Sequence, residues 1–130
     1  TPIICSNSER RVIKLERFEK IIQSAMKQSL KFTLPKLNEP IKLSQFINQE
    51  FDGKVCIAHC EEGKDKNLLQ SVVKPSEKTT ILIGPEGDFS SKEIKKCLEK
   101  NLIPISLGES RLRTETAGLV AVNIISFINQ

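Results

Sequence analysis

Aromatic residues are scarce in this chain: tryptophan and tyrosine are absent, and phenylalanine occurs six times in 130 residues. Proteins that bind single-stranded RNA without sequence preference usually stack its bases on successive aromatic rings. Because phenylalanine is the only aromatic residue here, such a stacking platform is not expected. Any contact with nucleic acid would instead depend on charge.

Cysteine and histidine are also few, with four cysteines that form no C-x-x-C pair and a single histidine. The cysteines and the histidine therefore lack the ligand spacings of zinc sites, and we expect no bound metal. We expect the thiols to be reduced and mostly buried, as in an intracellular protein. The longest run without charge, residues 116–130, is too short to span a bilayer, and no signal-peptide pattern opens the chain. We therefore expect a cytoplasmic protein with no membrane segment.

Length and composition fit one domain, since 38% of the residues are hydrophobic and 28% are charged. The chain opens on an expected strand, 1–5, without an initiator methionine, so we expect it to be part of a longer protein. Its net charge of +4 is unevenly placed, because eight basic residues face three glutamates between residues 9 and 36. This stretch permits phosphate contact through Arg10, Arg11, Lys14 and Lys31, although a solvated helix face explains the same pattern.

Hydrophobic periodicity predicts an α/β fold. Apolar residues at helical spacing predict an amphipathic helix over 12–30, followed by an extended segment over 33–40 and a short helix that Ser44 caps. Nearly continuous apolar runs predict strands at 55–60, 80–83 and 102–107, and a small helix at 68–73. The first of these strands ends at a turn over 61–63, and Pro104 indicates that the last lacks part of its hydrogen-bond ladder at its start. Strands of this kind are covered on both faces and form a parallel sheet.

Two further helices are predicted. The helix after Ser90 has complete start signals, because Ser90 and Glu93 form a capping box while Phe89 and Ile94 form a hydrophobic staple; it ends near residue 100. The last helix, 116–128, is apolar on nearly every side, unlike a lone surface helix. It is either sandwiched in the core or buried against a second subunit.

Two glycine-marked loops follow apolar strands in the C-terminal half. Gly84-Pro85-Glu86-Gly87 follows the strand over 80–83, and Leu107-Gly108 opens a second loop that runs to Ala117. Open α/β sheets bind their ligands at the carboxyl ends of their strands. The first loop lacks the Gly-Lys-Ser/Thr of a P-loop and the third glycine of a dinucleotide site. Pro85 and Gly87 suit a type I turn over 84–87, which alone is also explained as a plain strand-to-helix connection.

The second loop carries alternating charges between a buried strand and an apolar helix. Arg111, Arg113 and Glu115 lie where charges are seldom left unless they pair or act. One interpretation is that Arg113 pairs with Glu115 or Glu86. Arginine also holds a uracil carbonyl or a phosphate, and the two roles are compatible if the pair orients the guanidinium.

These segments resemble the signatures of RsmE-type methyltransferases of the SPOUT superfamily, and the resemblance covers essentially the whole chain. It rests on Gly84-Pro85-Glu86-Gly87 with Phe89-Ser90 and Glu93-Ile94, on Leu107-Gly108, and on the run from Leu112 to Ala117, with Ala25, Gln28 and Leu34-Pro35 upstream. There are three departures, two in these motifs and a third at the N-terminus, where the family has an RNA-binding barrel and a first strand and helix before the position of Thr1. Asp88 stands where the family usually has a second glycine, Ser110 where it has an arginine, and Arg111 at a usually aliphatic place.

The resemblance implies a SPOUT-type parallel sheet flanked by helices, with a C-terminal trefoil knot that is an exception to the rule against knots. It implies a homodimeric enzyme that transfers a methyl group from S-adenosylmethionine to N3 of a uridine in 16S ribosomal RNA of the small subunit. Residues 1–130 would form the methyltransferase domain, without the family's N-terminal RNA-binding barrel and the first strand and helix of the domain. The cofactor-binding residues would be Ile83, Gly84, Pro85, Glu86, Gly87, Leu107, Gly108, Leu112, Thr114, Thr116 and Ala117.

Arg113 and Glu115 are the candidate catalytic residues. Uracil N3 must lose a proton, and Arg113 would stabilise the charge that spreads onto the flanking carbonyl oxygens. Glu115 is expected to act as base or to orient Arg113, away from the sulfonium, with Asp88 as a second candidate base; Arg111 joins the RNA-binding residues. The alternatives are a non-catalytic RNA-binding or dimerisation module of the same fold, and a nucleotide phosphate-binding enzyme, against which the missing lysine beside the glycine loop weighs.

Overall fold

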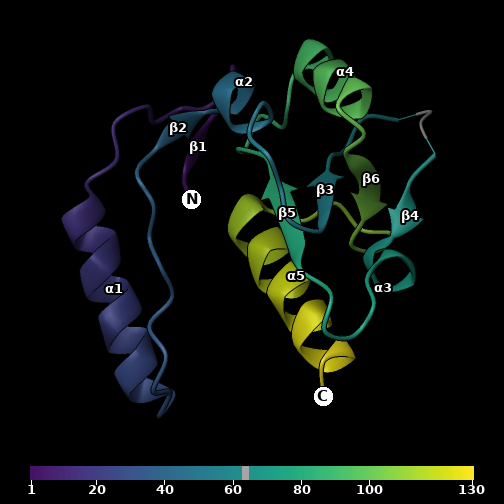
Figure 1. Ribbon diagram of the computed structural model, residues 1–130. Helices are drawn as coiled ribbons and strands as arrows, with labels where there is room; N and C mark the ends of the chain where they lie inside the picture. Colours follow the sequence, from purple (N-terminus) through teal and green to yellow (C-terminus); the bar gives the residue numbers. More distant parts are fainter. Residues whose placement is uncertain (63–64) are drawn as a thin grey trace.

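The computed structural model describes residues 1–62 and 65–130, and its centre is a four-stranded parallel sheet in the order β4-β6-β3-β5 (Figure 1). The strands are β3 (Lys54–Ala58), β4 (Asn67–Leu68), β5 (Thr79–Ile83) and β6 (Ile103–Ser106). β3 pairs with β5 from Lys54↔Thr79 to Ala58↔Ile83. Two short strands, β1 (Ile3–Ile4) and β2 (Ile41–Lys42), form a separate parallel pair. The predicted parallel sheet is confirmed.

Helices cover both faces of the sheet. The helices are α1 (Leu15–Gln28), α2 (Leu43–Phe46), α3 (Leu69–Val72), α4 (Ser91–Glu99) and α5 (Thr114–Ile128). Alternate residues of a strand point to opposite faces. Accordingly, Ile57 of β3 packs in one buried cluster with residues of α2 and α4, whereas Cys56 packs in a second cluster with residues of α3 and α5. The predicted α/β layers, with helices on both sides, are therefore present.

Helix α1 stands beside this sheet and its covering helices (Figure 1). The amphipathic pattern correctly predicts a helix, but none of the helix's residues is buried. Leu15, Ile22 and Met26 are half-buried, while Phe18 is 44% exposed. The periodicity thus identified the helix without identifying what its apolar face contacts.

Several boundaries differ from the predictions. Ser44 lies inside α2, which follows Lys42 without a side-chain cap, so the expected Ser44 cap is wrong. Because a two-residue strand is too short for a periodic pattern, β4 was not predicted. The expected turn at 61–63 lies partly outside the described residues. Pro104 behaves as predicted, because β6 pairs with β4 only from Ile105 onward.

The cysteines are free thiols, of which Cys5, Cys56 and Cys97 are buried and Cys60 is exposed. Burial raises the pKa of Cys5 to about 12 and that of Cys97 to about 11, so both thiols stay protonated at neutral pH. This confirms the predicted reduced and mostly buried cysteines. Within the described ranges, no helix is both long and apolar enough to cross a membrane.

Candidate functional site

The carboxyl ends of β3, β5 and β6 open onto a cavity of about 900 Å³. Its walls are the segment after β3, the loop after β5 and the loop between β6 and α5. The last two are the glycine-marked loops singled out in the sequence. Parallel strands bring their carboxyl ends to one edge of the sheet. The last residues of β3, β5 and β6, which are Ala58, Ile83 and Ser106, therefore lie at the same edge. The volume is that of a site for a small organic ligand.

A backbone hydrogen bond closes a turn in the loop after β5. The N–H of Asp88 donates to the carbonyl oxygen of Pro85 at 2.8 Å, so the turn spans Pro85–Asp88 and not residues 84–87 as predicted. Gly84 is buried, and a Cβ there would lie 3.1 Å from the ring of Phe89 and 3.2 Å from Oδ1 of Asp88. Phe89 is itself a buried core residue. Gly84 is thus closely packed, and a side chain at 84 would need the Phe89 ring and the Asp88 carboxylate to shift by a few tenths of an ångström.

The loop after β6 is shaped by Ser106 and Gly108. The Ser106 Oγ donates to the carbonyl oxygen of Gly108 at 2.8 Å and accepts from its N–H at 3.3 Å. Gly108 has φ 139, a conformation that side chains rarely adopt. The loop ends at α5, which begins at Thr114, two residues before the predicted start. Arg113 therefore stands at the N-cap position of α5.

One side-chain hydrogen bond joins the two loops. Thr114 Oγ1 donates to the carbonyl oxygen of Gly84 at 3.0 Å, across thirty residues of chain. Both groups line the cavity. The structure therefore brings together the two motifs that sequence analysis treated as one site.

Charged side chains of both signs line the cavity. Arg111, Arg113, Glu86 and Glu115 are all exposed lining residues. Neither Arg113 nor Glu115 forms a salt bridge with a residue of the described part, so the expected pairing of Arg113 with Glu115 or Glu86 is wrong for this structure. Two cationic side chains are consequently available at the cavity mouth to a bound anion or carbonyl group.

Most of the predicted cofactor-binding residues share this cavity. They are Ile83, Gly84, Pro85, Glu86, Leu107, Gly108, Leu112, Thr114 and Ala117. Gly87 and Thr116 are not among its lining residues. Gly87 faces Asn7 instead, since a Cβ on it would lie 3.0 Å from the Asn7 Cβ, and Thr116 is exposed on the first turn of α5.

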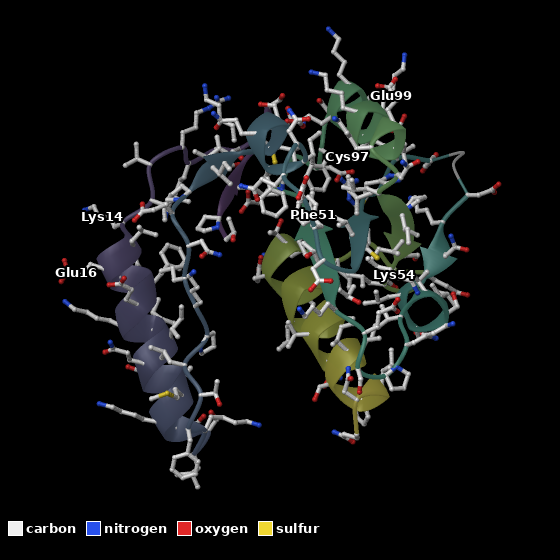
Figure 2. The ribbon with its side chains drawn as sticks, viewed as in Figure 1. Lys14, Glu16, Phe51, Lys54, Cys97 and Glu99 are labelled. Carbon is white, nitrogen blue, oxygen red and sulfur yellow. The ribbon has the colours of Figure 1, made fainter. Side chains whose placement is uncertain are left out.

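The predicted RNA-binding residues fall into two groups. Arg111 lines the cavity, whereas Arg10, Arg11, Lys14 and Lys31 are exposed around the two ends of α1. Arg11 contacts the segment after β1, because its Nη2 donates to the carbonyl oxygen of Ser6 at 3.1 Å. Figure 2 labels Lys14 at the start of α1, on the side of the molecule away from the sheet.

Two positioning contacts from the N-terminal segment were missed in the sequence. Asn7 Nδ2 donates to the carbonyl oxygens of Gly87 at 3.0 Å and Asp88 at 3.1 Å. The N–H and Oγ of Ser6 both donate to Oε1 of Glu93, at 2.8 and 3.1 Å. Sequence separations of about eighty residues leave no local signal for such contacts. They connect the segment after β1 to the loop and helix that follow β5.

The start of α4 confirms the predicted capping box. The Glu93 N–H donates to Oγ of Ser90 at 3.2 Å, and the Ser90 N–H donates to Oε2 of Glu93 at 2.9 Å. Burial by itself raises the pKa of Glu93, but the hydrogen bonds from Ser90 and Ser6 outweigh it and lower that pKa overall. Phe89 and Ile94, the predicted staple, are buried in the same cluster.

Fold and site together define an α/β domain with a ligand-sized cavity at the carboxyl ends of its strands, lined in part by the two motif loops, and comparison with known proteins gives its class. The family model described as an RNA methyltransferase domain matches residues 1–126. The chain therefore belongs to the RNA methyltransferase domain family, and the resemblance drawn from the motifs is confirmed. Among the described residues, no cluster of three or more His, Cys, Asp or Glu side chains is placed to hold a metal ion.

Curated relatives agree with this assignment. The chain is 34% identical over 114 residues to the ribosomal RNA small subunit methyltransferase E of Buchnera aphidicola, covering 86% of this chain and 44% of that protein. It is 32% identical to the same-named protein of Aquifex aeolicus, covering 95% of this chain and 54% of the relative. The chain thus spans about half the length of these relatives.

Solved structures give the same result. A probable rRNA methyltransferase from Porphyromonas gingivalis is 43% identical with a TM-score of 0.89, over 98% of this chain and 54% of that one. A methyltransferase from Legionella pneumophila, solved with bound S-adenosylmethionine, is 27% identical with a TM-score of 0.88, over 99% of this chain and 55% of that one.

Proposed function

We propose that this chain is the methyltransferase domain of an enzyme that uses S-adenosylmethionine to methylate N3 of a uridine in 16S ribosomal RNA of the small subunit. The observation that carries the proposal is the cavity at the carboxyl edge of the sheet, two of whose walls are the RsmE-type motifs joined by the Thr114–Gly84 hydrogen bond. The names of the relatives and the cofactor in the Legionella structure support the substrate and the cofactor.

The cavity suits a cofactor that has both an apolar part and polar ends. Ile83, Leu107 and Leu112 supply apolar walls, while Gly108 exposes backbone to the cavity with open space where a Cβ would stand. Its volume of about 900 Å³ exceeds what a single amino acid or nucleobase needs and is sufficient for a ligand of this size. When bound, S-adenosylmethionine supplies the methyl group.

Arg113 is the residue that we propose assists the uracil. Its exposed side chain leaves the N-cap position of α5 at the cavity wall, and it is not committed to an ion pair in the described part of the chain. Removing the N3 proton leaves negative charge on the two flanking carbonyl oxygens, and a guanidinium placed there stabilises it. Glu115, also on the cavity wall, is the proposed proton acceptor, with Asp88 as the second candidate.

We further propose that the active form is a homodimer built on α5. The inner side of this helix is buried through Ala117 and Ala121, yet Leu119, Val122 and Phe127 remain 71%, 69% and 65% exposed. Such a large apolar surface on one helix is characteristic of an interface. A trefoil knot in the C-terminal part, which the family resemblance implies, and a cytoplasmic location, which the sequence composition predicts, belong to the same proposal.

Phosphate contact by the RNA is assigned to Arg10, Arg11, Lys14, Lys31 and Arg111, all of which are exposed. A non-catalytic module that binds RNA or dimerises through the same fold is the alternative function. The exposed apolar side of α5 is the observation in its favour, since that surface requires no turnover of cofactor.

The test is methyl transfer to purified small ribosomal subunits, or to 16S RNA that lacks the modification, followed by mass spectrometry of the digested nucleosides. We expect a 3-methyluridine that depends on added S-adenosylmethionine. Binding of the cofactor without any methylated nucleoside would support the non-catalytic alternative, and a methyl group on another atom or base would contradict the proposed specificity.

A further inference from the structure

We propose that Asp88 is a positioning residue: its side chain fastens the turn Pro85–Asp88 to the carboxyl end of β3 and so fixes the shape of the cavity before a ligand enters. The inference rests on the proposed function, because it concerns the loop that would hold the cofactor. It also assigns a purpose to the clearest departure of this chain from the RsmE-type pattern.

The backbone of Asp88 explains why a glycine is the usual residue at this place. Its φ is 60, in the left-handed region that glycine adopts freely. Among the other residues, aspartate and asparagine tolerate this region best. Glycine and aspartate are therefore both compatible with this backbone conformation, and aspartate adds a carboxylate.

The carboxylate is used in a specific contact. Oδ2 of Asp88 accepts a hydrogen bond from the N–H of Cys60 at 2.8 Å, across 28 residues of chain. Cys60 lies two residues beyond the end of β3, and both residues line the cavity. The bond therefore joins the segments that leave two neighbouring strands, β3 and β5, at the cavity wall.

The other groups of Asp88 are fixed as well. Its N–H closes the turn on Pro85 at 2.8 Å, and its carbonyl oxygen accepts from Asn7 at 3.1 Å. Oδ1 lies toward Gly84, at 3.2 Å from the position that a Cβ would take there. One residue thus connects the turn to two other segments of the chain, those of Asn7 and Cys60. A loop that is ordered in this way before binding has less conformational entropy to lose when a ligand arrives.

Three substitutions separate the carboxylate from the backbone conformation. Asp88→Asn keeps an acceptor oxygen and tolerates positive φ, whereas Asp88→Gly keeps the conformation but removes the acceptor. Asp88→Ala removes both. Asn101→Gly is the matched control, since Asn101 has φ 62 at the end of α4, is exposed, and does not line the cavity.

The first measurement is made without ligand. Amide hydrogen exchange of Cys60, followed by NMR, should be about fivefold to tenfold faster in Asp88→Gly than in the unsubstituted protein and should be restored within about twofold by Asp88→Asn. Asn101→Gly should leave it unchanged. If the Cys60 amide hydrogen exchanged at the same rate in the unsubstituted protein and in Asp88→Gly, the proposed contact would be overturned. This conclusion does not depend on which ligand the protein binds.

The second measurement is the dissociation constant for S-adenosylmethionine, by titration calorimetry. Asp88→Gly should weaken binding about fivefold, Asp88→Ala by at least as much, and Asp88→Asn and Asn101→Gly by less than about twofold. Unchanged affinity in Asp88→Gly, or equal losses in Asp88→Gly and Asp88→Asn, would overturn the positioning role while leaving the proposed function intact. If the folded, unsubstituted protein bound no S-adenosylmethionine, the proposed function itself would fail, and with it the reason for the positioning.

Discussion

Thr114 is the residue whose removal most directly tests whether the two loops act as one site. Its Oγ1 donates to the carbonyl oxygen of Gly84 at 3.0 Å, and Gly84 is buried. Thr114→Val removes the donor but keeps the β-branched shape. The loss of one such hydrogen bond costs about 1 kcal/mol, which corresponds to about a fivefold change in an equilibrium constant.

The free-energy cost of losing this hydrogen bond divides between protein stability and cofactor affinity, which are measured separately. Part appears as a lower free energy of unfolding, and part as weaker binding of S-adenosylmethionine, because the loops are no longer held together before the ligand enters. We expect the dissociation constant to rise about twofold to fivefold by titration calorimetry, with a loss of stability that accounts for the remainder.

Thr116→Val is the control, because Thr116 is exposed on the same helix and does not line the cavity. It should change neither quantity beyond experimental error. The reasoning would be refuted if Thr114→Val left both the affinity and the stability unchanged, or if the two substitutions weakened binding equally.

Three further predictions concern catalysis, pH and the backbone. Arg113→Ala should lower the rate of RNA methylation by about 100-fold, while the affinity for S-adenosylmethionine stays within about twofold. An unchanged rate would show that Arg113 does not act on the uracil. Glu93→Gln should be less stable than the unsubstituted protein at neutral pH. Because the pKa of Glu93 is lowered in the folded state, this difference should shrink in denaturant titrations as the pH falls from the ordinary glutamate pKa through the lowered one, and a difference independent of pH would contradict it. Gly53→Ala should destabilise the fold by more than about 2 kcal/mol in chemical denaturation, since Gly53 has φ 100 and a Cβ would lie 2.0 Å from the Lys78 carbonyl oxygen. Gly118→Ala, in the open interior of α5, should instead stabilise by up to about 1 kcal/mol, and equal effects at the two glycines would be the contrary result.

The fold was largely predictable from the sequence because its signals are local. The capping box at Ser90 and Glu93 depends on residues three apart, and continuous apolar runs identify strands buried on both faces. Where the signal is short or ambiguous, prediction failed. β4 has two residues, and Ser44, a good capping residue, lies inside α2 instead.

The site was predictable in its loops but not in its supports. Gly84 and Gly108 are recognisable because glycine marks loops that follow apolar strands, whereas the contacts of Asn7 with the loop after β5 join residues about eighty positions apart. Hydrophobic periodicity also could not show what the apolar face of α1 contacts, because the same pattern arises in a helix that has no buried residue.

A crystal structure of the protein with S-adenosylmethionine would test the central claim most directly. The account predicts that the cofactor occupies the cavity at the carboxyl ends of β3, β5 and β6, against the backbone of Gly84 and Gly108, with Arg113 at the open side. A cofactor bound elsewhere, or a cavity without cofactor at a saturating concentration, would contradict it.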